Sequence, residues 1–63
     1  MRFRDVTVEG VAVEIGLYDG DGGVAAFVNT ADLDDCEPVE NCADEESAIA
    51  ILTERLTARL RAE

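Results

Sequence analysis

The sequence predicts an α+β fold of the order β-β-β-α, in which a three-stranded antiparallel sheet packs one face against a single C-terminal amphipathic helix. Two observations predict this fold. Apolar and polar residues alternate with a period of two over residues 6–18, and apolar residues recur at helical spacing over residues 49–60. With 63 residues, the chain is expected to form a single domain, 1–63, whose small core gives only marginal stability.

The first two strands are expected to form a hairpin. Val6 and Val8 share one parity, whereas the apolar residues of 11–17 share the opposite parity. A tight turn ending at Gly10 produces this change, because glycine readily adopts the positive φ that such a turn requires. The turn would place Val8 opposite Val11. A single long strand with a bulge at Gly10 is the alternative.

A second hairpin and a third strand are expected next. The sequence DGDGG at residues 19–23 is the clearest turn signal in the chain. The sequence VAAFVNT that follows, residues 24–30, predicts a strand whose apolar run suits a central position in the sheet. Because Phe27 is the bulkiest residue of this strand, we expect it to make the largest single contribution to the core.

The final third of the chain predicts a helix. Its apolar stripe consists of Ile49, Leu52, Leu56 and Leu60. Asp44 is the expected N-cap, with acidic residues after it in the first turn and arginines toward the C-terminal end, as the helix dipole favours. Ile51 points nearly opposite the stripe, beside Ala58, so these two residues indicate a second contact surface.

The other face of the sheet is expected to be thinly apolar, with Thr7, Ala12, Glu14 and Tyr18 on it. Small domains with thin cores commonly gain the missing burial from a second copy of themselves. We therefore expect a homodimer, formed either by pairing of sheet edges or by packing of one sheet on another. The candidate interaction residues are Tyr18, Ile51 and Ala58.

The charge composition is unusual. Fifteen acidic residues face five basic ones, all arginine, which gives a net charge of −10. Such self-repulsion destabilises a compact chain at ordinary ionic strength, but the Debye length falls to about 3 Å at 1 M salt. The acids are spread over the whole chain, so the composition resembles that of halophilic archaeal proteins. A mimic of nucleic acid, or a ligand for a basic partner, is the alternative interpretation.

Residues 31–47 combine many acids with both cysteines and are interpreted as an acidic connection that ends in the helix cap. Three interpretations of Cys36 and Cys42 stay open. They can pack as small hydrophobic residues, form a disulfide, or contribute to a metal site. Structural zinc needs four soft ligands, and the chain offers two cysteines and no histidine. Packing is the favoured interpretation, and no metal or cofactor is expected.

Catalysis, membranes and nucleic acids are not expected to be involved. A cysteine nucleophile needs a base such as histidine, and the acids lie in segments too polar to desolvate a carboxyl group. The arginines of residues 2–4 and 55–61 are interpreted as partners for acids and for the helix terminus rather than for phosphate. No stretch approaches the roughly 18 apolar residues of a membrane span, and no secretory signal is recognisable, so a cytoplasmic location is expected.

Several short motifs in residues 11–60 follow one another in a familiar order. They are Asp-Gly-Gly at 21–23, VAAFV at 24–28, DLDDC at 32–36 and DEESA at 44–48. In this order they resemble the N-terminal domain of HicB-type antitoxins, although acids replace the proline and glycine that the family tends to show near its cysteine. The resemblance implies a module of three strands and a helix that oligomerises and binds a partner protein, in that family a small basic RNA-cleaving toxin.

Taken together, the sequence predicts a small non-enzymatic protein–protein interaction module, homodimeric and adapted to high salt. The first alternative is a HicB-like antitoxin that binds a small basic RNase toxin. The second alternative is a metal- or redox-responsive element built on Cys36 and Cys42.

Overall fold

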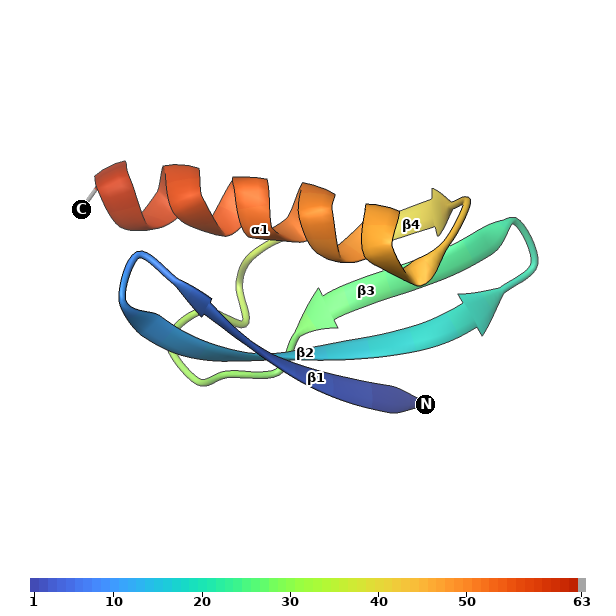
Figure 1. Cartoon of the computed structure of the whole chain (residues 1–63), viewed down its shortest axis with the longest axis horizontal. Helices are drawn as coiled ribbons and strands as arrows, with labels where there is room; N and C mark the ends of the chain where they lie inside the picture. The colour runs from blue at the N-terminus through green and yellow to red at the C-terminus, as the bar shows by residue number, and fades with distance from the viewer. Residues whose placement is uncertain (63) are drawn as a thin grey trace.

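The computed structural model describes residues 1–62 and confirms an α+β fold with one C-terminal helix. The elements are β1 (Arg2–Val8), β2 (Val11–Gly20), β3 (Gly23–Val28), β4 (Val39–Cys42) and α1 (Glu45–Ala62). The strands form one sheet in the order β1-β2-β3-β4, with each neighbouring pair antiparallel. The helix runs along one face of this sheet, with the β1–β2 turn near its C-terminal end and the β2–β3 turn near its N-terminal end (Figure 1).

The first hairpin has the predicted register. Val8 lies opposite Val11 and Val6 opposite Val13. Glu9 and Gly10 form the turn with φ values of 50° and 77°, the pair of positive angles that a type I′ turn requires. The alternative of one bulged strand is therefore wrong.

The second hairpin is tighter than predicted. The ladder continues to the pair Gly20–Gly23, so only Asp21 and Gly22 remain in the turn. The third strand ends at Val28, two residues before the predicted end at Thr30. It lies between β2 and β4, so its predicted central position is confirmed.

The prediction of three strands is wrong, because a fourth strand lies within the acidic segment. Val39 pairs with Ala26 and Cys42 with Val24, with an irregularity in the register between the two pairs. Val39 and Cys42 are buried, and Leu33 in the preceding turn is buried too. The segment therefore contributes to the core, and only part of it is a connection.

The helix begins where the sequence predicts. The backbone N–H of Ser47 donates a hydrogen bond of 2.8 Å to Oδ1 of Asp44, which makes Asp44 the N-cap. Ala48, Leu52 and Leu56 are fully buried, and Ile49 and Leu60 pack at the margin of the core. The predicted stripe is thus the face that packs on the sheet, chiefly on β3 and β4.

The cap makes helix stability dependent on pH. The hydrogen bond from Ser47 lowers the pKa of Asp44, so the folded state holds the carboxylate form more strongly than the unfolded state does. This contribution is complete above the unfolded pKa, about 3.9, and is lost as the pH falls through the lower folded pKa. Asp44→Asn keeps the acceptor oxygen but cannot titrate. We therefore expect the difference between the melting temperatures of wild type and Asp44→Asn to change with pH, with wild type losing stability relative to the variant at acid pH. Thermal scans between pH 2 and 7 measure this difference. An equal difference at every pH would contradict this role for the carboxylate.

The prediction that Phe27 contributes most to the core is also wrong. The neighbouring residues Ala26 and Val28 are buried against the helix side, together with Ile15 and Leu17 of β2. Side chains alternate along a strand, so the ring of Phe27 lies on the opposite face of the sheet. The core between sheet and helix is therefore entirely aliphatic apart from Cys42.

Candidate interaction surface

All three aromatic residues of the chain lie on the sheet face opposite α1, which we call the outer face. The register places Gly16 of β2 opposite Phe3 of β1 on one side and opposite Phe27 of β3 on the other. Tyr18 lies two residues further along β2, and therefore on the same face. Phe3 is 51% exposed and Tyr18 36% exposed. The outer face thus has an aromatic centre that the helix does not cover.

Gly16 explains why the aromatic rings gather there. A Cβ atom at this position would overlap the ring of Phe27, so the absence of a side chain leaves space for that ring over β2. The rings of Phe27 and Tyr18 are tilted by 50°, with centroids 6.1 Å apart, within the range of favourable aromatic pairs. Phe27 is consequently half-buried and supports the more exposed Tyr18.

A recess of about 200 Å³ adjoins Tyr18 at the β2–β3 turn. It is lined by Tyr18, Gly20, Asp21, Gly22, Gly23, Ala25, Glu40 and Asn41. Within residues 1–62, the carboxylates of Asp21 and Glu40 have no hydrogen bond or ion pair. The recess therefore combines an aromatic wall with two uncompensated negative charges.

The far end of the outer face is acidic as well. Asp5 of β1 lies directly opposite Glu14 of β2. Asn29 donates a hydrogen bond of 2.7 Å from Nδ2 to Oε1 of Glu14, which orients that carboxylate without neutralising it. Like charges in directly opposite positions of a sheet repel each other. The aromatic centre is thus bounded by carboxylates at both ends.

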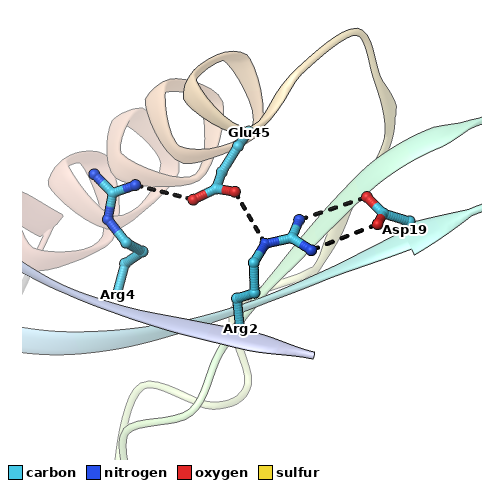
Figure 2. A network of polar contacts seen from close by, with 4 residues as sticks. All are labelled: Arg2, Arg4, Asp19 and Glu45. Carbon is cyan, nitrogen blue, oxygen red and sulfur yellow. Dashed lines mark hydrogen bonds and ion pairs between the residues drawn. The ribbon is translucent and has the colours of Figure 1, made fainter.

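The two N-terminal arginines connect β1 to the start of the helix. Arg2 lies between two acids, with Nε 3.1 Å from Glu45 Oε2 and Nη1 3.5 Å from Asp19 Oδ2 (Figure 2). Arg4 approaches the other oxygen of Glu45 at 2.9 Å. Asp19 and then Glu45 raise the pKa of the Arg2 guanidinium above its ordinary value. Both cations are thus held on the helix side of the sheet.

The C-terminal arginines bind α1 to the segment 32–38 and to the β1–β2 turn. Arg55 donates to the carbonyl oxygens of residues 37 and 38, and Arg59 donates to the carbonyl of residue 32 and pairs with Asp35 at 3.2 Å. Arg61 pairs with Glu9 of the first turn at 3.0 Å. The five arginines therefore form two groups, Arg2 and Arg4 at the start of the helix and Arg55, Arg59 and Arg61 further along it, and each arginine contacts acids or carbonyl oxygens.

The three predicted interaction residues fall on two different surfaces. Tyr18 lies on the outer face, whereas Ile51, 40% exposed, and the exposed Ala58 lie on α1. The sequence interpretation missed Phe3 and Phe27 as members of the outer face. The predicted register of the first hairpin, continued to the pair Phe3–Gly16, is the signal that would have found Phe3.

The cysteines are both free thiols in the structure. Cys42 is buried and its Sγ lies 3.8 Å from the carbonyl oxygen of Glu40, while the half-buried Cys36 packs against the core. Among residues 1–62, no group of three or more histidine, cysteine or acidic side chains is arranged to hold a metal ion. The same residues include no helix long and apolar enough to cross a membrane.

No family model, no curated protein and no solved structure matches the chain. The resemblance to HicB-type antitoxins therefore stays a prediction from short motifs.

Proposed function

We propose that the protein is a small non-enzymatic protein–protein interaction module that binds through its outer face. The observation that carries this proposal is the gathering of all three aromatic residues on the one sheet face that the helix leaves open. Contiguous exposed apolar patches mark interaction sites, and aromatic residues are enriched at the centres of protein interfaces.

The same face supports self-association at high salt. At low ionic strength two copies repel each other, because each has a net charge of −10 and acids bound the face. Salt near 1 M reduces the Debye length to about 3 Å, so the apolar contact between two outer faces then dominates. We propose that the free protein is a homodimer under these conditions and that the acidic composition is an adaptation to them.

Removing exposed aromatic side chains is expected to dissociate this homodimer. Phe3→Ser and Tyr18→Ser leave the aliphatic core intact, and each is expected to weaken dimerisation at 3 M KCl by about tenfold or more, as is usual for aromatic residues at an interface centre. Sedimentation equilibrium from 0.1 to 3 M KCl measures the effect.

Ile51→Ser on α1 is the matched control, because it removes a similarly exposed apolar side chain from another surface. Its dimerisation is expected to equal that of wild type. If Ile51→Ser disrupts the dimer and the outer-face variants do not, the dimer interface lies on the helix and not on the outer face. A protein that is monomeric at every salt concentration would remove the homodimer from the proposal.

A further inference from the structure

We propose that the recess beside Tyr18 receives an arginine side chain from a basic partner protein bound on the outer face. This inference deepens the proposed function and rests on it, because the recess adjoins the aromatic centre through Tyr18. The partner that replaces the second copy on the outer face is then a protein segment with an arginine next to apolar residues.

The lining of the recess suits a guanidinium group. Its volume of about 200 Å³ equals that of about seven water molecules at roughly 30 Å³ each, enough for a guanidinium and the adjoining methylene groups. Tyr18 offers an aromatic ring, on which guanidinium groups stack. Asp21 and Glu40 offer carboxylates, which arginine binds by paired hydrogen bonds.

The cation has to come from another molecule. Asp21 and Glu40 have no ion pair within residues 1–62, whereas all five arginines contact acids or carbonyl oxygens elsewhere in their own chain. A second copy would bring acids against acids and no uncommitted arginine. Charge complementarity therefore favours a basic partner over a second copy, and such a partner is expected to displace the homodimer.

Arginine suits this recess better than lysine. The guanidinium is planar, weakly hydrated and able to stack, whereas the ammonium group of lysine is a compact and strongly hydrated point charge. Long-range attraction is screened at high salt, so binding there depends on short contacts such as stacking and paired hydrogen bonds. Tyr18 is therefore as important to the proposal as the two carboxylates.

The test is a titration of the ¹⁵N-labelled protein with N-acetyl-arginine amide, at the highest KCl concentration at which sedimentation shows a monomer. N-acetyl-citrulline amide, which has a similar shape and no charge, is the matched ligand. We expect the arginine derivative to shift the backbone amides of Gly20, Gly22, Gly23 and Asn41. The citrulline derivative is expected to bind at least about tenfold more weakly, since charged hydrogen bonds are the stronger ones.

Variants of equal charge separate a specific site from general attraction. Asp21→Asn with Glu40→Gln is expected to weaken binding about tenfold or more, whereas Asp34→Asn with Glu46→Gln, which removes two exposed acids elsewhere, is expected to leave it unchanged. Tyr18→Leu is expected to weaken binding by loss of stacking.

Three results would overturn the inference: equal shifts with citrulline, equal weakening by both double variants, or shifts spread over the whole surface. If any of these occurs while Phe3→Ser still dissociates the homodimer, the arginine site is refuted and the proposed function of the outer face stands.

Discussion

Gly23→Ala is expected to destabilise the domain by about 3 kcal/mol or more, a large part of its total stability. Gly23 has a φ of +141°, a backbone conformation that residues other than glycine rarely adopt. An added Cβ would also overlap the carbonyl oxygen of Cys42. That oxygen belongs to the backbone of β4, so it cannot move without breaking the β3–β4 pairing. Strained backbone and overlap together cost about 3 kcal/mol or more, whereas a chain of this length has a total stability of about 3–9 kcal/mol.

Gly20→Ala is the matched control, because Gly20 lies opposite Gly23 in the same hairpin. The nearest atom to its added Cβ is the carbonyl oxygen of Gly23 at 3.6 Å, an ordinary contact. Urea denaturation followed by far-ultraviolet circular dichroism at 3 M KCl would measure both variants. Similar midpoints for the two variants would show that β4 is not closely packed against the turn.

The hairpins and the helix could be predicted from sequence because their signals are local. Positive φ at Gly10 and the change of parity around it define one register, and only that register places the valines on one face. Asp44 is followed by acids and then by apolar residues at helical spacing, so its cap, the dipole charges and the stripe all indicate the same helix.

The fourth strand could not be predicted in the same way. It has four residues, VENC, of which only the first and last are buried. A spacing of three between buried residues fits neither regular alternation nor a helix of useful length. The spacing follows from the irregular register opposite β3 and from Asn41, whose φ is 60°, and both are consequences of tertiary packing.

The outer face was only partly predictable for a related reason. Tyr18 was assigned to it from the alternation of β2. Phe27 lies in an almost wholly apolar run, where alternation cannot tell one face from the other. The sheet face on which the Phe27 ring lies is determined by Gly16 on the neighbouring strand, because Gly16 provides the space for the ring. The recess is lined in part by residues of β4, so it could not be predicted without that strand.

Raising KCl from 0.1 to 3 M is expected to increase the melting temperature by more than about 10 °C. Only four acids form ion pairs with arginine in the described part of the chain, namely Glu9, Asp19, Asp35 and Glu45. Most of the other acids are exposed and repel one another, and this repulsion acts over about 10 Å at 0.1 M salt but only about 3 Å at 1 M. An increase of 10 °C corresponds to roughly 1.3 kcal/mol for a domain of this size. Calorimetry at graded KCl concentrations measures it.

A variant with fewer charges identifies the cause, since concentrated salt can also strengthen apolar burial. The substitutions Asp34→Asn, Glu37→Gln, Glu46→Gln and Glu54→Gln replace exposed acids whose side chains have no partner among residues 1–62, and they change the net charge from −10 to −6. If repulsion is the cause, this variant melts above wild type at 0.1 M KCl, responds less to salt, and converges with wild type at 3 M. Parallel increases in both proteins would assign the salt effect to apolar burial, in the core or in the homodimer. The acidic composition would then not be an adaptation to salt, and binding of a basic partner would be the better explanation for it.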